Sequence, residues 1–157
     1  PLTPVQQENG DWMPPVVADS LDARHFFLCA SHLYRYTKGG GNNWTSAQWS
    51  SFDFGVAAGE YLSALSFSPL DPQRAYAVTD RGRLYHSSDH GLTWTASSST
   101  APGGQYFYGT ALLASTVSVD TVYVGGSGYS GPAVYRSTDG GVTFQAWSTG
   151  LPVVSPR

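Results

Sequence analysis

The sequence predicts an all-β fold, and three observations support this expectation. Glycine and proline are frequent, at 18 and 10 of 157 residues, and they fall between short apolar runs, as turn residues do between strands. No stretch of useful length shows the hydrophobic period of an amphipathic helix. In addition, a unit of about 50 residues recurs along the chain, and a period of this size is typical of repeat architectures.

The second copy of the unit is the clearest. Its four β-rich runs cover residues 61–68, 74–79, 83–88 and 93–98, and turn sequences separate them. The first of these turns contains Pro72, which presets the backbone φ angle that a turn needs. Each unit is therefore predicted to be a meander of four short antiparallel strands.

The repeat is most visible at the turn before the fourth run. Residues 84–94, LYHSSDHGLTW, are echoed by VYRSTDGGVTF at 134–144. A third copy, LYRYTKGGGNNW at 33–44, is degenerate, because Lys38 replaces the aspartate and one extra residue precedes Trp44. The three copies thus place one kind of turn at intervals of about 50 residues.

The segments upstream of these turns match as well. Each carries an acidic residue at the predicted turn between its first two strands, namely Asp22, Asp71 or Asp120. Each segment then runs into a β-rich stretch. The third segment matches the other two more loosely.

Four-stranded units at this spacing are typical of β-propeller blades. The chain, residues 1–157, is predicted to be a single segment with three such antiparallel blades, at about 11–50, 60–99 and 107–149. Propellers typically need about four to eight blades to close a ring. The predicted partners are therefore the remaining blades of a larger propeller, of which this chain is a fragment, or a second copy of the chain.

The residues of the repeated turn each have a structural role. The carboxylate of Asp89 can accept hydrogen bonds from turn amides, and Gly91 can adopt a φ angle that other residues resist. The hydroxyls of Ser87 and Thr93 can bond across the turn, and Trp94 offers a large apolar surface to pack beneath it. The same roles fall to Ser137, Asp139, Gly141, Thr143 and Phe144.

The recurrence of the turn argues against an acid–base site built from Asp89 and His90, because a catalytic site would not need two copies. The second copy has Gly140 in place of His90, so His90 is predicted to be replaceable by glycine. For the same reason we expect no metal there. No cofactor is expected for the chain.

The sequences SSDHGLTW and STDGGVTF resemble the Asp-box, S-x-D-x-G-x-T-[WF], also called the bacterial neuraminidase repeat. Families with this repeat include sialidases, xyloglucan-active glycoside hydrolases, the sortilin receptor domain and photosystem assembly factors. The chain looks most like the xyloglucanase-like and sortilin-like branch, and the resemblance covers nearly all of it. It implies a β-propeller with ligand sites on the face opposite the Asp-boxes, and an extracellular or periplasmic location. It implies no single activity, because one fold hosts many functions.

The candidate ligand-binding residues lie in the linkers between units and in the turns between second and third strands. These segments are expected on the face opposite the repeated turns, because successive turns of a meander alternate between its two ends. Aromatic side chains beside carboxylates and arginines suit sugar recognition. The candidates are Asp53, Glu60, Tyr61, Asp80, Arg81, Tyr106, Tyr108 and Tyr129, with Arg83 nearby. Alternatively, Tyr106 and Tyr108 pack between blades.

The preferred function is a binding or scaffold module, part of a larger secreted or surface protein with a carbohydrate or protein ligand. The alternative is a fragment of a glycoside hydrolase, xyloglucanase-like rather than a sialidase. Hydrolysis needs two carboxylates that flank the scissile bond. A pair cannot be chosen among Asp53, Glu60 and Asp80, so the catalytic residues are unknown and this chain alone is not expected to be an enzyme.

Charge and composition argue against other classes. The net charge is −3 and the chain has one lysine, so nucleic acid is not an expected partner. No run of about 18 apolar residues predicts a membrane span. Cys29 is the only cysteine, lies in an apolar run and is expected to be a buried structural thiol.

Overall fold

A computed structural model of the chain describes residues 10–55, 59–98, 109, 111–127 and 132–150. These residues form three four-stranded antiparallel sheets, each a meander in chain order, which confirms the predicted all-β fold. The first sheet contains β1 (Val16–Ala18), β2 (His25–Cys29), β3 (Leu33–Lys38) and β4 (Trp44–Gln48). The second contains β5 (Leu62–Phe67), β6 (Ala75–Thr79), β7 (Leu84–Ser87) and β8 (Thr95–Ala96). The third contains β9 (Ala111–Ala114), β10 (Val122–Gly125), β11 (Val134–Ser137) and β12 (Gln145–Ala146).

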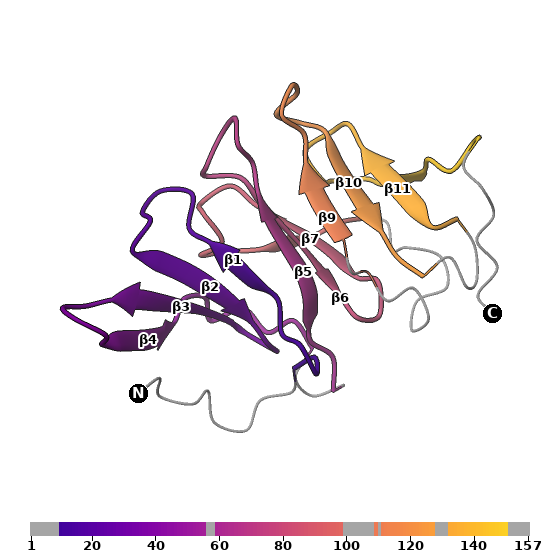
Figure 1. Ribbon diagram of the computed structural model, residues 1–157. Coiled ribbons are helices and arrows are strands. Elements are labelled where there is room, and N and C mark those ends of the chain that lie inside the picture. Colours follow the sequence, from indigo (N-terminus) through magenta and orange to yellow (C-terminus); the bar gives the residue numbers. More distant parts are fainter. Residues whose placement is uncertain (1–9, 56–58, 99–108, 110, 128–131, 151–157) are drawn as a thin grey trace.

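The three sheets are arranged as a fan, with the second sheet between the other two (Figure 1). All five side chains of β6 are buried, because the second sheet is covered on both faces. A strand buried on both faces loses the alternation of apolar and polar residues. In the third sheet, β10 keeps the alternation of buried and half-buried side chains.

Two apolar clusters hold the fan together. The first joins the first and second sheets, and its Phe27 side chain is fully buried near the rings of Trp49 and Phe67. The second joins the second and third sheets and includes Tyr76, Val78, Val122, Val124 and Phe144. Full burial of each large apolar side chain stabilises the folded state by about 1.5–3 kcal/mol. Sheet-on-sheet packing is thus the main source of stability.

Successive turns alternate between two edges of the fan (Figure 1). The turns between first and second strands, at 19–24, 68–74 and 115–121, lie at its upper edge, which we call the turn edge. The segment before β5 and the β6–β7 turn at 80–83 lie at the lower edge, which we call the linker edge. This arrangement separates the repeated turns from the segments that contain the candidate ligand-binding residues.

The turns at the turn edge share one hydrogen-bonding scheme. The amide of Arg74 donates to the carbonyl of Asp71 at 2.9 Å, and that of Thr121 donates to Ser118 at 3.2 Å. Ser118 therefore occupies the position of Asp71, and Asp120 lies two residues further on. The looser sequence match of the third segment thus reflects an aspartate that lies later in its turn.

The degenerate copy of the turn is a plain β-hairpin. The β3–β4 ladder continues to the pair of Lys38 and Trp44, and Gly39 then donates to Asn43 across the turn at 2.9 Å. On the fourth strand, Ser46 pairs with Tyr36. Ser46 therefore takes the place that Trp94 has in the second sheet. Trp44 is therefore not the counterpart of Trp94, although the sequences suggest it. Its ring instead contacts Phe26, 5.1 Å between centroids.

Cys29 is fully buried at the end of β2, as the sequence predicts, and burial raises the pKa of its thiol to about 12. The thiol therefore stays protonated and has little nucleophilic character. Within the described ranges, no helix is long and apolar enough to cross a membrane.

Candidate functional site

The turn at 87–94 is held by a closed set of hydrogen bonds around Asp89. The hydroxyl of Ser87 donates to Oδ1 of Asp89 at 2.8 Å, and the amide of Thr93 donates to the same oxygen at 2.9 Å. Oδ2 accepts the Thr93 hydroxyl at 2.5 Å. Gly91, with φ of 80°, donates its amide to Ser87 Oγ, and the indole of Trp94 donates to the Gly91 carbonyl. The carboxylate is thus used by its own turn.

The turn at 137–144 repeats this set. Ser137 and the amide of Thr143 donate to Oδ1 of Asp139 at 2.7 and 2.9 Å, and the Thr143 hydroxyl donates to Oδ2 at 2.6 Å. Partial burial raises the pKa of Asp139, but the hydrogen bonds from Thr143 and Ser137 outweigh it and lower the pKa to about 2. Burial raises the pKa of Asp89 as well, and the hydrogen bonds from Thr93 and Ser87 again outweigh it and lower the pKa. Both carboxylates are therefore ionised acceptors and poor proton donors at neutral pH.

These pKa shifts predict how acid affects the turn. A carboxylate with a lowered pKa contributes stability that is fully present above its ordinary pKa of 3.8 and is lost as the pH falls through about 2. We expect Asp139→Asn to lower the melting temperature at pH 7, and the difference from the wild-type chain to shrink between pH 4 and pH 2. Thermal unfolding from pH 7 to pH 2 measures this, with the exposed neighbour Thr138→Ala as control. A difference that stays constant over this range would contradict the assignment.

His90 corrects the expectation that glycine can replace it. Its side chain is buried, and its ring lies between the first two sheets, stacked on Phe67 at 4.5 Å. Nδ1 lies 2.5 Å from the carbonyl oxygen of Pro72, and Nε2 lies 3.0 Å from Oδ1 of Asp19. Asp19 is buried and also contacts Nδ1 of His25 at 3.3 Å through its other oxygen. His90 thus connects the first and second sheets. Gly140, which has the same place in the third sheet, has no side chain for such a contact.

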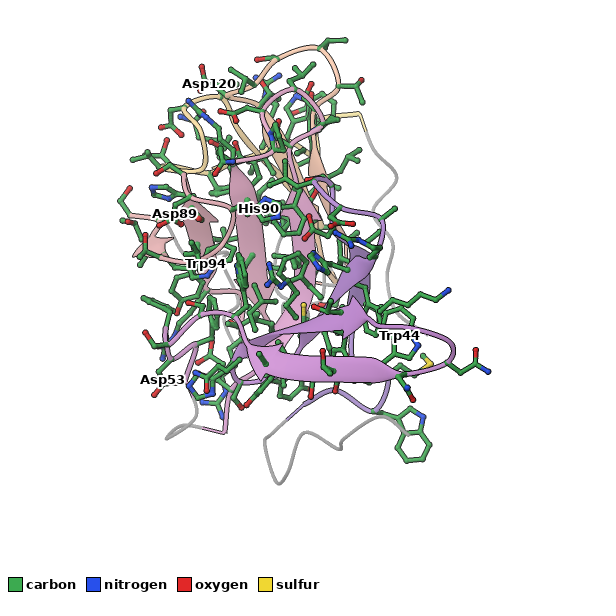
Figure 2. The ribbon with its side chains drawn as sticks, turned by 90° about the vertical axis from the view of Figure 1, so that its left-hand side faces the viewer. Trp44, Asp53, Asp89, His90, Trp94 and Asp120 are labelled. Carbon is green, nitrogen blue, oxygen red and sulfur yellow. The ribbon has the colours of Figure 1, made fainter. Side chains whose placement is uncertain are left out.

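Gly140 leaves room for another inter-sheet contact. A Cβ atom at this position would lie 2.8 Å from the guanidinium of Arg74, which pairs with Asp120 at 2.6 Å. An Arg–Asp pair between the second and third sheets therefore takes the place that the Asp19–His90 pair has between the first and second. Figure 2 shows Asp120, Asp89 and His90 well above Asp53. Among the described residues, no group of three or more His, Cys, Asp or Glu side chains could hold a metal ion.

At the linker edge, Glu60 lies at the centre of a polar cluster. The carboxylate is fully buried, accepts the hydroxyl of Thr79 at Oε1 and places Oε2 3.3 Å from Nε of Arg83. Thr79 Oγ1 also accepts the amide of Arg83 at 3.1 Å. Glu60 thus holds the β6–β7 turn and presents no carboxylate oxygen at the surface. A residue that contacts a ligand directly would need one, so the structure does not place Glu60 in the predicted ligand-binding role.

Arg83 extends from this cluster to the surface. Its side chain is 52% exposed, while Nε forms an ion pair with Oε2 of Glu60 at 3.3 Å without the geometry of a hydrogen bond. Burial raises the pKa of the neighbouring Tyr85, and a hydrogen bond from Arg83 to its hydroxyl partly offsets this. The charge of the exposed Asp53 also raises the pKa of Tyr85. Arg83 therefore reaches solvent from an ion pair with a buried carboxylate.

The other candidates are used by the backbone or lie outside the description. Oδ1 of Asp80 accepts the amide of Tyr61 at 3.2 Å, and the amide of Asp80 donates to the Tyr61 carbonyl at 3.1 Å. These two residues tie the linker to the β6–β7 turn. Arg81 is exposed in that turn. Tyr106, Tyr108 and Tyr129 lie outside the described residues.

Sequence reasoning did not identify Thr79 and Tyr85 as members of this cluster. Both are in strands, where alternation predicts only which face a side chain takes. The available signal was the acidic residue of the linker facing a turn with two arginines, RGR at 81–83. A buried carboxylate requires a partner, so this turn was the place to look for one.

The first strands line a hollow of about 510 Å³. Residues 63–65 of β5 and 111–113 of β9 form one part of its wall, and Asp11, Met13 and Pro15 form the other. Its lining is largely apolar, which distinguishes it from the charged cluster around Glu60.

Comparison with protein-family models and with curated proteins found no match. Among solved structures, the chain is similar to a GH74 enzyme from Niastella koreensis, with 22% identity and a TM-score of 0.54 over 83% of this chain and 22% of that one. It is similar to YCF48 from Cyanidioschyzon merolae, with 18% identity and a TM-score of 0.57 over 91% of this chain and 41% of that one. It is also similar to the GH74 xyloglucanase from Xanthomonas campestris, with 19% identity and a TM-score of 0.54 over 87% and 23%.

The fold is that of a β-propeller. At these identities the likeness shows the fold alone. The chain spans from about a fifth to less than half of the length of these neighbours, so it contains only a part of the propeller that they have.

Proposed function

We propose that the chain is a segment of a larger β-propeller of the Asp-box type and acts as a binding module through its linker edge. The observation that carries the binding role is the half-exposed guanidinium of Arg83, anchored by the fully buried carboxylate of Glu60. The assignment to the Asp-box type is supported by the identical hydrogen bonds in the two turns at 87–94 and 137–144.

The anchor matters because it reduces the entropic cost of binding. A free arginine side chain loses up to about 2 kcal/mol of rotamer entropy when a ligand fixes it. The ion pair with Glu60 already restricts Arg83, so part of that loss occurs on folding. The guanidinium then offers planar donors that suit carboxylates and hydroxyl pairs. Asp53, exposed nearby, adds acceptors for hydroxyl or amino groups.

These groups suit a glycan or a polypeptide ligand. Support for each comes from the structural neighbours, one of which is named a xyloglucanase and another YCF48 bound to a D1 peptide. The aromatic candidates Tyr106, Tyr108 and Tyr129 would complete a sugar-binding surface, and their contribution stays a prediction. The extracellular or periplasmic location also stays a prediction from the resemblance.

The alternative function is a fragment of a glycoside hydrolase, which the GH74 neighbours favour. Of the three carboxylates predicted at this edge, Glu60 is buried against Arg83 and Asp80 accepts a backbone amide. Asp53 is the exposed one. The pair that hydrolysis needs would therefore require a carboxylate from outside these three residues. No turnover of xyloglucan or sialoside by the 157-residue chain is the expected result.

The binding role predicts a specific loss in one arginine variant. We expect Arg83→Ala to weaken binding of the ligand found by screening the chain on glycan arrays and peptide libraries. The expected loss is about tenfold or more, because an anchored, charge-assisted contact contributes about 1.5–3 kcal/mol. Isothermal titration calorimetry measures the affinity, and thermal unfolding tests whether the variant remains folded.

Arg24→Ala is the matched control, because Arg24 is a 73% exposed arginine paired with Asp22 at the opposite, turn edge. Its variant should bind as the wild-type chain does. Equal affinities of the Arg83 variant and the wild type would reject the linker edge as the binding surface. A loss with Arg24→Ala instead would place binding at the turn edge. Turnover of a glycan that Asp53→Asn abolishes would favour the hydrolase.

A further inference from the structure

His90 lies at the contact between the first and second sheets, where aromatic side chains of both enclose its ring. The residue is 4% exposed. Its ring stacks on Phe67 at 4.5 Å and lies at steep angles to Phe27 and Trp49, 5.7 and 6.3 Å between centroids. Buried polar atoms almost always have hydrogen-bond partners, so the two ring nitrogens depend on the groups within this contact.

The partners of the two ring nitrogens are both hydrogen-bond acceptors. Nδ1 lies 2.5 Å from the carbonyl oxygen of Pro72, and a carbonyl oxygen can only accept. Nε2 lies 3.0 Å from Oδ1 of Asp19, and an ionised carboxylate can also only accept. A neutral imidazole has a single N–H, so it would leave one nitrogen lone pair facing an oxygen. Both contacts are satisfied when a proton lies on each side of the ring.

The surroundings favour the ring, rather than the carboxylate, as the holder of the proton between Nε2 and Oδ1. An imidazole is ordinarily a stronger base than a carboxylate. Oδ1 of Asp19 also accepts the amide of Leu21 at 2.8 Å, and such a bond favours the ionised form of a carboxyl group. The face of the Phe67 ring attracts a cation at this distance. These contacts favour an imidazolium opposite a carboxylate.

Other charged groups lie on the elements packed around His90. They are His25 and Arg35 on the first sheet, and Asp71, Arg74 and Asp89 on the second. His25 faces the other oxygen of Asp19, and Arg35 lies over the ring of Trp49. Asp71 pairs with Arg74, and Asp89 accepts hydrogen bonds from its own turn. In the described part of the chain, the charge in contact with the His90 ring is thus that of Asp19.

We infer that His90 holds two protons in the folded chain and thereby makes the contact between the first and second sheets depend on pH. Loss of the Nε2 proton would leave its lone pair opposite Oδ1 of Asp19, two acceptors 3.0 Å apart. The attraction between ring and carboxylate then becomes a repulsion at a buried site. The contact is therefore tightest where the ring keeps both protons, and it loosens as the pH rises.

The contact between the second and third sheets lacks this dependence. Its charged pair is Arg74 with Asp120 at 2.6 Å, and a guanidinium stays charged throughout the range in which histidine titrates. Burial lowers the pKa of His86, which lies against the Gly141 turn, so this ring is uncharged above neutral pH. One of the two contacts between neighbouring sheets thus responds to pH.

Hydrogen bonds to the backbone keep the sheets together when the proton is lost. The donor side chains are Trp49 and Ser50 for the first contact and Ser97 and Ser98 for the second, and each donates to a carbonyl of the following sheet. The indole of Trp49 reaches the carbonyl of His90 itself, at 3.0 Å. Indole and serine hydroxyl groups keep their protons near neutral pH, so the first sheet loosens without separating.

Nitrogen-15 NMR of the imidazole rings counts the protons on His90 directly. At pH 7 we expect both ring nitrogens of His90 at the chemical shift of protonated nitrogen, with the residue identified by through-bond correlation to its backbone. One protonated and one unprotonated nitrogen at this pH would overturn the inference. The measurement uses the wild-type chain, so it decides the question even where a variant fails to fold.

Asp19→Asn tests the carboxylate in the same spectrum. The asparagine side chain can donate to Nε2, so a ring with one proton satisfies both of its contacts. We expect His90 to hold a single ring proton at pH 7 in this variant. Two ring protons would mean that Asp19 does not hold the second one, which would contradict the inference.

Unfolding in urea between pH 6.5 and pH 8.5 measures the effect on stability. Histidines of the unfolded chain lose their protons at a pKa of about 6.5. While the folded chain holds one proton more, the unfolding equilibrium constant rises with pH, by up to about tenfold per pH unit. His90→Asn should remove this rise, and asparagine tolerates the backbone at this position, where φ is 60°.

His25→Asn is the matched control, because His25 contacts the other oxygen of the same carboxylate. This variant should keep the rise of the unfolding constant with pH. A constant that does not rise in the wild-type chain, or a rise that persists in His90→Asn, would overturn the inference. A rise that His25→Asn removes and His90→Asn retains would assign the proton to His25 and overturn it as well.

Discussion

Replacing Asp19 with alanine should be the most damaging single change, because each buried group that is left without its hydrogen-bond acceptor costs about 1–3 kcal/mol. The side chain of Asp19 is 3% exposed, and its oxygens contact His90 at 3.0 Å and His25 at 3.3 Å. Oδ1 also accepts the amide of Leu21 at 2.8 Å. The alanine variant would leave two half-buried or buried imidazoles and one amide without this acceptor.

The measurement is equilibrium unfolding in urea, followed by tryptophan fluorescence. Asp19→Asn retains one oxygen acceptor and the size of the side chain, so it should recover a part of the loss. The matched control is Asp22→Ala, three residues further along the same turn, whose carboxylate pairs with the exposed Arg24. Its effect should be a small fraction of the Asp19 effect. Equal effects at the two positions would show that Asp19 acts on its turn alone and not between sheets.

Replacing Gly141 with alanine should be the second most damaging change. Gly141 has φ of 87°, and a residue with a Cβ atom loses about 1–2 kcal/mol in this left-handed region. The new Cβ would lie 3.0 Å from Cδ1 of Tyr76 and 3.1 Å from Cβ of His86. Overpacking of this kind adds about 1–3 kcal/mol. Tyr76 is buried, so it has little room to move away.

Thermal and urea unfolding measure the loss, and Val142→Ala is the control in the same turn. Val142 is 46% exposed, and its inter-sheet contacts are made by its backbone carbonyl, which alanine retains. The control should therefore unfold close to the wild-type chain. Substitution of Gly141 without a loss of stability would mean that the second and third sheets are not packed as closely as the structure places them.

The fold and the repeated turns could be predicted from the sequence because their information is local. Ser87, Asp89, Gly91 and Thr93 bond to one another within a few positions, so residue type and spacing suffice to identify the turn. The same locality made the second unit easy to divide into strands. The predicted fourth run at 93–98 is longer than β8, Thr95–Ala96, because Thr93 and Trp94 belong to the turn.

The role of His90 could not be predicted, because its partners are distant in the sequence. Asp19 is 71 positions away and belongs to another sheet. Comparison with Gly140 suggested a dispensable side chain, since two aligned turns were assumed to have equivalent surroundings. The turns are equivalent, but the sheets they pack against are not. One presents Asp19, and the other presents Arg74.

Glu60 illustrates the same limit at the candidate site. A glutamate in a loop-rich linker is expected at the surface, because charged residues are rarely fully buried. Its burial depends on Thr79 and Arg83, about 20 positions further along the chain in the β6–β7 segment. The sequence therefore predicted the edge of the sheet correctly for these residues, but it could not assign which of them reaches solvent.

The contacts of Trp49, Ser50, Ser97 and Ser98 have an evolutionary consequence. Their acceptors are main-chain carbonyls, which every amino acid possesses. A gene segment that encodes one sheet can therefore be duplicated or exchanged without loss of these particular contacts. The side-chain contacts between sheets are different, because the Asp19–His90 and Arg74–Asp120 pairs need matched partners on both sheets. Ring size can therefore change by whole units where the backbone contacts are kept and the paired side chains are matched again.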